Sequence, residues 1–305
     1  SALRAFMTDS SQTKLIHSAS EDLEVFSHWL GVLPAPLFDT QRAAALVGLG
    51  AGQSYRALVA HFFDIELPKD ETQSDWLQRP LTDAQAHYAA QDVTYLHPMG
   101  VQLQNRAMER NRLEWVLEEG ARLRPGGKPP IAKFKTAYRL QPEQQRVLAE
   151  VVEWREGEAR QRDRPRSWIL NDKIVMGVAR NVPRSVRELA AVEDMPQGLV
   201  RRAGDDLVGR IIDAADSDTD QAPAVIPKPL ASEQRGSVSM LSKCLKEIAE
   251  SLDIPAEVLM PKADLEHLVR EQMNPSLAAP ENWSGWRAET VVAPLRERLK
   301  ERAAS

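Results

Sequence analysis

The sequence predicts a mostly helical protein of three units, the first of which also contains short strands. Two segments rich in proline, glycine and charge, at 124–130 and 216–229, cannot continue a helix and divide the chain. Apolar residues three or four apart follow each segment, as amphipathic helices require. A short apolar run, Leu15-Ile16, lies just before a capping pair and indicates a strand that leads into a helix.

The first predicted helix begins near Ser18 and carries an acidic residue in its first turn. Ser18 and Glu21 have the spacing of a capping box, in which each side chain bonds the other residue's backbone N–H. Asp22 then lies near the positive end of the helix dipole, where carboxylates are favoured whether or not they bind metal. Asp22 is therefore a candidate ligand at the mouth of a sheet.

A second helix is predicted to start after Thr82, because Thr82 and Gln85 also have capping-box spacing. Tyr88 and Asp92 are four residues apart and share one face of this helix, where they can hold a metal ion and a water. The spacing alone fits a tyrosine packed into a core beside a solvated aspartate equally well. The choice between the two therefore depends on the rest of the chain.

The middle unit is the basic one. Residues 1–120 have a net charge of −7, residues 121–230 of +4 and residues 231–305 of −2. Basic residues in the middle unit that are candidates to hold phosphates are Arg155, Arg160, Arg162, Arg164 and Arg166. Trp154 and Trp168 lie among them and are candidates for stacking on bases. The alternative is a solvated helix face with tryptophans in the core.

Composition excludes several classes of protein. The chain has 305 residues, 43% of them hydrophobic and 27% charged, which is enough for two or three ordinary cores. Its single cysteine, Cys244, excludes an internal disulfide framework and a cysteine-based zinc cluster. No apolar run is long enough to span a bilayer and no signal peptide is visible, so we expect a cytoplasmic protein without a membrane partner.

Four segments in order carry a resemblance to a known family. They are His17 to Phe26, Leu37 to Gln41, Ser74 to Thr82 and Thr82 to Asp92. In this order they resemble ribonuclease D, a 3′–5′ exoribonuclease whose catalytic set is four carboxylates and a tyrosine. The resemblance implies that Asp22 and Asp92 are the third and fourth carboxylates and metal ligands, and that Tyr88 is the catalytic tyrosine.

The later units are similar to the helical HRDC domain that helicases and ribonuclease D share. The resemblance begins at Gln141-Pro142-Glu143 and includes Leu148, Trp154 and Asp163. The implied fold is an α/β ribonuclease-H-like exonuclease domain lacking its first strands, followed by two all-α HRDC-type bundles. The expected boundaries are a partial exonuclease domain at 1–123, a linker at 124–139, a first bundle at 140–215, a linker at 216–230 and a second bundle at 231–305.

The implied reaction is hydrolysis of the 3′-terminal phosphodiester of RNA to release nucleoside 5′-monophosphates. The family's substrates are precursor tRNA 3′ ends, so the expected partner is RNA with a free 3′ end. Two Mg²⁺ or Mn²⁺ ions are the expected cofactors, and Tyr88 is expected to orient the attacking water. Two alternatives stay open: a single-strand DNA exonuclease with the same carboxylates, and a non-catalytic RNA-binding module.

The first two carboxylates of the family come from an Asp-x-Glu on the opening strand, ahead of Asp22. The stretch from Ser1 to Asp22 does not contain this motif, so the chain is expected to be an N-terminally truncated enzyme with weak metal binding and negligible activity. Asp64-Ile65-Glu66 has the same pattern but follows Asp22 in the chain. We interpret it as surface charge.

Overall fold

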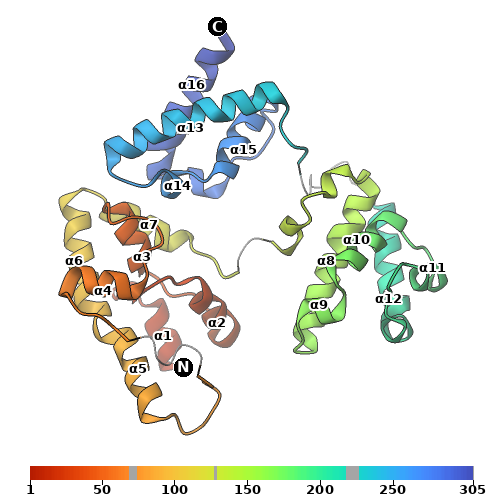
Figure 1. Cartoon of the computed structure of the whole chain (residues 1–305), viewed down its shortest axis with the longest axis horizontal. Coiled ribbons are helices and arrows are strands. Elements are labelled where there is room, and N and C mark those ends of the chain that lie inside the picture. The colour runs from red at the N-terminus through yellow and green to blue at the C-terminus, as the bar shows by residue number, and fades with distance from the viewer. Residues whose placement is uncertain (69–73, 127–128, 218–226, 305) are drawn as a thin grey trace. The chain divides into compact units, whose positions relative to one another are not determined.

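The computed structural model describes residues 1–68, 74–126, 129–217 and 227–304, which form two compact units (Figure 1). The first unit combines Ser1–Gly127 with Leu230–Ser305, and the second comprises Lys128–Pro229. The structure is predominantly helical, as the sequence predicts. Among the described residues, no helix combines the length and apolar character needed to cross a bilayer.

The first unit contains a two-stranded parallel sheet near its N-terminus. Strand β1 (Lys14–Ile16) pairs with β2 (Leu37–Asp39), with Lys14 opposite Leu37 and Ile16 opposite Asp39. Helix α2 (Ser20–Leu30) connects them, as the crossover between parallel strands requires. The prediction of a short strand at Leu15-Ile16 that leads into a helix is confirmed.

The other described elements of the first unit are helical. From the N-terminal segment they are α1 (Ala2–Thr8), α3 (Thr40–Leu46), α4 (Tyr55–Phe63), α5 (Asp83–Thr94), α6 (Leu96–Glu109) and α7 (Leu113–Arg122). From the C-terminal segment they are α13 (Ser232–Leu252), α14 (Ala256–Leu259), α15 (Lys262–Met273), the 3₁₀-helix η3 (Glu281–Trp283), the π-helical turn η4 (Ala288–Val292) and α16 (Ala293–Ala304).

The two segments of the first unit share one hydrophobic core, to which Phe38 and Leu103 contribute from one segment and Leu241 from the other. The rings of Trp115 and Trp286 stack across the junction, 4.5 Å between centroids and 8° from parallel. Burial of apolar surface from both segments therefore holds residues 230–305 on the first segment.

Two buried arginines add directional contacts to this core. Arg112 donates to the carbonyl of Leu46 at 2.6 Å and also to the carbonyl of Leu252. Arg287 forms a buried ion pair with Glu119 and donates to the carbonyl of Leu259 at 2.9 Å. Each guanidinium thus has acceptors on the opposite segment, which is what a buried cation requires.

The second unit is an all-helical bundle. Its elements are η1 (Pro130–Lys133), η2 (Ala137–Arg139), α8 (Pro142–Gln161), α9 (Arg166–Ile169), α10 (Asp172–Asn181), α11 (Val186–Ala190) and α12 (Gln197–Asp216). Its core contains Leu148 and Val151 from the expected helical stripe, and also Phe134 and Ala137. The later part of the segment expected to be a linker at 124–139 therefore packs into this bundle.

The linker expected at 216–230 falls mainly on residues 218–226, which lie outside the described part of the chain. The residue boundaries given above stay predictions. In the segment expected to be a second HRDC-type bundle, 231–305, helix α13 begins at Ser232. In addition, the structure shows that this bundle shares its core with the N-terminal segment.

Gly120 lies at the close contact between α7 and β2. A Cβ at this position would lie 1.9 Å from the carbonyl oxygen of Leu37, so the helix approaches the strand closer than any other residue allows. We expect Gly120→Ala to destabilise the first unit by about 1–3 kcal/mol through overpacking, measured by urea unfolding followed by circular dichroism.

The matched control is Gly157→Ala in α8, where a Cβ would meet nothing within 4 Å. Because alanine is the better helix former, this change should stabilise the second unit by up to about 1 kcal/mol. Equal or greater stability of Gly120→Ala relative to the unchanged protein would contradict the close contact.

Candidate active site

Asp39, at the end of β2, is a buried carboxylate that organises the opening of the site. One of its oxygens accepts the backbone N–H groups of Gln41 at 2.8 Å, Arg42 at 3.2 Å and Ser18 at 3.3 Å. The other accepts the N–H of Ala19 at 2.9 Å. Asp39 therefore caps α3 and also holds the turn that enters α2.

The capping box predicted between Ser18 and Glu21 is wrong. Helix α2 begins at Ser20, its N-cap is Ala19, and no side chain caps it. Ser18 has a left-handed backbone with φ of 59°, which removes it from the N-cap geometry. The physical reason is that Asp39 already accepts the N–H groups of Ser18 and Ala19.

Asp22 does lie in the first turn of α2, as predicted, and its side chain is exposed. Partial burial, followed by the negative charges of Glu21 and Asp39, raises its pKa, against a smaller lowering by its own backbone N–H. Among the described residues, no Lys, Arg or His forms an ion pair with Asp22. Its negative charge is therefore not neutralised by a neighbouring side chain.

The capping box at the start of α5 is confirmed. Gln85 donates its N–H to the Thr82 hydroxyl at 3.1 Å, and Thr82 donates its N–H to the Gln85 side chain at 3.0 Å. Further along α5, the half-buried Tyr88 packs its ring on Trp76, 5.9 Å between centroids. Asp92 is exposed one turn later, and partial desolvation raises its pKa.

Tyr55, from α4, contacts the end of α5. Its hydroxyl donates to the carbonyl of Gln91 at 3.0 Å and accepts the N–H of Tyr95 at 3.1 Å. Burial first, and then the negative charge of Asp92, raises the pKa of Tyr55. Asp92 therefore lies close enough to Tyr55 for its negative charge to raise the pKa of the Tyr55 hydroxyl.

His17 contacts Thr40, at the start of α3, and Tyr55, in α4. Its ring packs edge-on against Tyr55 at 5.7 Å, and its Nδ1 lies 2.9 Å from the Thr40 hydroxyl. Burial lowers the pKa of His17, while the charge of Asp39 opposes this. His17 therefore has a packing role at this site.

Printed contacts thus run from the turn before α2, which Asp39 holds, through His17 and Tyr55 to the backbone on either side of Asp92. Within the described ranges, no three His, Cys, Asp or Glu side chains are close enough together to form a metal cluster. That Asp22, Tyr88 and Asp92 converge on one metal site stays a prediction. The sequence analysis missed the contacts of Asp39 with Ser18 and Ala19 and those of Tyr55 with Gln91 and Tyr95, because these partners are 20 to 40 residues away in the chain.

The other Asp-x-Glu pattern lies apart from these contacts. Asp64 ends α4 with a left-handed backbone, φ of 55°, and both Asp64 and Glu66 are exposed. Neither forms an ion pair with another described residue. Both features agree with the interpretation of this segment as surface charge.

The five arginines expected to bind nucleic acid differ in their burial and in their ion pairs. Arg155 is 1% exposed and bonds the carboxylate of Asp172 at 2.7 Å and the carbonyl of Leu170 at 3.1 Å. A buried side chain cannot reach a phosphate, so the prediction for Arg155 is wrong. Arg162 pairs with Glu158, and Arg166 pairs with Glu156 at 3.3 Å.

Arg160 and Arg164 are exposed and form no ion pair within the described part of the chain. Arg164 lies over the ring of Trp168 at 5.8 Å, and Trp168 is 71% exposed. Trp154, by contrast, is buried and donates its indole N–H to Asp206 at 3.0 Å, which agrees with the alternative of a tryptophan in the core and not with stacking on bases.

Comparison with known proteins agrees with this architecture. The 3′–5′ exonuclease family model matches residues 1–107, and the HRDC domain model matches residues 144–211. Ribonuclease D of Pseudomonas paraeruginosa is 39% identical over 305 residues, which cover 96% of this chain and 80% of that protein. Ribonuclease D of Escherichia coli is 30% identical over 314 residues, which cover 99% of this chain and 82% of that protein.

The crystal structure of Escherichia coli RNase D, described as an exoribonuclease involved in structured RNA processing, has the same fold. The TM-score is 0.80 at 30% identity, with 98% of this chain and 82% of that chain covered. The match confirms the predicted fold class of an exonuclease domain followed by HRDC-type helices. From the identity, the coverage and the shared fold together, this chain belongs to the ribonuclease D family of 3′–5′ exoribonucleases.

Proposed function

We propose that this protein removes nucleotides from the 3′ ends of structured RNA, with precursor tRNA as the substrate, and that Asp22, Tyr88 and Asp92 carry the reaction. The observation that supports this assignment is the pair of exposed carboxylates on α2 and α5. Both have raised pKa values, and neither is paired with a described cation. Carboxylates in this state are suited to bind a cation from solution.

The donor chemistry fits a divalent metal. Asp22 and Asp92 offer hard oxygen ligands, which Mg²⁺ and Mn²⁺ prefer. Mg²⁺ is commonly held by one or two carboxylates together with waters and substrate phosphates, so Asp22 and Asp92 fit a mostly hydrated ion as two of the four carboxylates that the family resemblance implies. When bound, such ions stabilise the attacking and leaving oxygens of the phosphodiester.

The three residues divide into two metal ligands and one residue that orients water. Asp22 and Asp92 would hold the metal, and Asp39 would keep Asp22 in position through the turn that enters α2. Tyr88 would orient the attacking water, because a phenol both donates and accepts hydrogen bonds. The contact of its ring with Trp76 limits the directions that its hydroxyl can take.

The second unit would supply affinity for the RNA strand. Arg160 and Arg164 are free to bind phosphates, and Trp168 offers an exposed face on which a base can stack. Arg162 and Arg166 contribute less, because each is already paired with a glutamate. The proposed RNA-binding surface therefore consists mainly of Arg160, Arg164 and Trp168, and includes fewer arginines than the five expected from the sequence.

The first test uses the protein expressed from its full open reading frame, with matched RNA and DNA oligonucleotides. Asp22→Asn and Asp92→Asn should each lower Mg²⁺-dependent release of 5′-monophosphates from RNA by about 100-fold or more, because each removes a metal ligand. The control is Asp64→Asn, an exposed carboxylate at a left-handed position where asparagine is well tolerated.

Full activity of Asp22→Asn or Asp92→Asn would contradict the assigned site. Preferential degradation of the DNA strand would favour the single-strand DNA exonuclease. Binding of RNA without any degradation would favour the non-catalytic module.

Metal binding should depend on pH through the raised pKa values of Asp22 and Asp92. A proton competes with the metal for each carboxylate. If the pKa of the carboxyl group is raised, the proton begins to displace the metal at a higher pH. Apparent Mn²⁺ affinity, measured by electron paramagnetic resonance, should therefore fall as the pH is lowered toward about 4, the ordinary pKa of an aspartate, and the fall should begin above that value. Affinity that does not change down to about pH 4 would show that these carboxylates are not the ligands.

RNA binding by the second unit is tested by two single changes. Arg164→Ala should reduce the slope of log affinity against log salt by about 0.7, the value for one phosphate contact on a single strand. Trp168→Ala should weaken binding by about 1–3 kcal/mol through lost stacking while leaving the salt slope unchanged. Fluorescence anisotropy of a labelled RNA oligonucleotide measures both quantities.

Arg201→Ala is the matched control, because Arg201 is an exposed arginine of the same unit on a different helix. An equal effect of Arg201→Ala would show that net charge alone governs binding. Unchanged RNA affinity of Trp168→Ala would show that Trp168 does not stack on a base of the RNA.

A further inference from the structure

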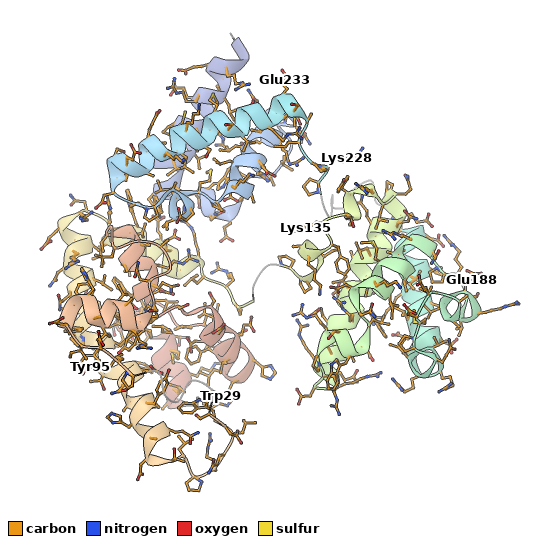
Figure 2. All side chains as sticks on the ribbon, in the orientation of Figure 1. Trp29, Tyr95, Lys135, Glu188, Lys228 and Glu233 are labelled. Atoms are coloured by element: carbon orange, nitrogen blue, oxygen red, sulfur yellow. The ribbon has the colours of Figure 1, made fainter. Side chains whose placement is uncertain are left out.

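Helices α5 and α6 are separated by an interruption next to Asp92. Tyr95 both ends α5 and precedes α6, at the position labelled in Figure 2. The sequence explains the break: Pro98 has no N–H to donate to the carbonyl four residues earlier, at Thr94. In the first turn of α6 the same proline is tolerated, so a new helix starts there.

The hydroxyl of Tyr55 occupies this interruption. In a continuous helix the N–H of Tyr95 would donate to the carbonyl of Gln91, four residues earlier. Here the Tyr55 hydroxyl accepts from the Tyr95 N–H at 3.1 Å and donates to the Gln91 carbonyl at 3.0 Å. A side chain from α4 therefore bridges a broken helical hydrogen bond, and Asp92 lies between the two bridged residues.

The ring of Tyr55 contacts a residue at the end of strand β1. It packs edge-on against His17, which directly follows β1, and the Nδ1 of His17 lies 2.9 Å from the Thr40 hydroxyl. The Thr40 hydroxyl in turn lies 3.3 Å from the carbonyl of Ile16 and donates to it. Tyr55 thus connects the ends of the strands, near Asp22, with the end of α5, which carries Asp92.

We propose that Tyr55 is a positioning residue for Asp92, setting the direction of that carboxylate toward the metal through the two backbone hydrogen bonds on either side of it. This inference rests on the proposed role of Asp92 as a metal ligand. It assigns to Tyr55 no contact with RNA and no proton transfer.

The test is Tyr55→Phe in the protein expressed from its full open reading frame, which keeps the ring and removes both hydrogen bonds. Residues that orient metal ligands typically change metal affinity by about 10- to 100-fold. We expect the Mg²⁺ concentration for half-maximal activity to rise by about 10-fold or more. Activity should recover at saturating Mg²⁺, and the dissociation constant for RNA should not change.

Tyr95→Phe is the matched control. It removes a nearby phenol hydroxyl that has no hydrogen-bond partner among the described residues, and it leaves the bridged backbone N–H intact. Its Mg²⁺ dependence should equal that of the unchanged protein. An equal shift in both variants would overturn the proposal, because it would show a general loosening of the region.

A misfolded Tyr55→Phe protein is recognised by a lower melting temperature and by activity that high Mg²⁺ does not restore, which would also count against a positioning role. If Asp92→Asn is inactive and Tyr55→Phe has unchanged Mg²⁺ dependence, only the role of Tyr55 fails. If Asp92→Asn is fully active, the proposed site itself fails.

Discussion

The buried carboxylate of Asp39 is the interaction on which the candidate active site depends. The described part of the sheet has only two short strands, so few ladder hydrogen bonds fix the helices that leave it. Asp39 compensates by accepting four backbone N–H groups, two from the turn into α2 and two from the start of α3. An amide in its place would turn one acceptor into a donor that faces N–H groups. The direction of Asp22 therefore follows from a carboxylate 17 residues later in the chain.

A second constraint joins the ends of the chain. Arg112 and Arg287 are buried cations, and each must find acceptors that water can no longer supply. Arg112 finds backbone carbonyls on both segments, and Arg287 finds Glu119 on α7. Removing one partner would leave a buried charge uncompensated, which is far more costly than losing a surface pair. These contacts explain why residues 230–305 form one unit with the N-terminal segment.

The sequence predicts the features that depend on neighbouring residues and misses those that depend on distant ones. The capping box of Thr82 and Gln85 forms because both partners lie within four residues. The similar pattern at Ser18 fails because Asp39, some 20 residues away, takes the same N–H groups. Arg155 was misassigned because the charge pattern of α8 does not show which face packs against Leu170. The family resemblance supplied Asp22, Tyr88 and Asp92, but only the structure shows what surrounds them.

The raised pKa values of Asp22 and Asp92 connect stability with function. A carboxyl group whose pKa is higher in the folded state binds its proton more tightly there, so ionising it above that pH costs the folded state free energy. The protein therefore keeps two carboxylates ionised at neutral pH at some expense of stability, although their exposure keeps the cost small. A divalent cation that binds only the ionised form recovers this free energy and adds to it. Because neither carboxylate forms an ion pair with a described Lys or Arg, the proposed metal ligands keep their charge available for a cation.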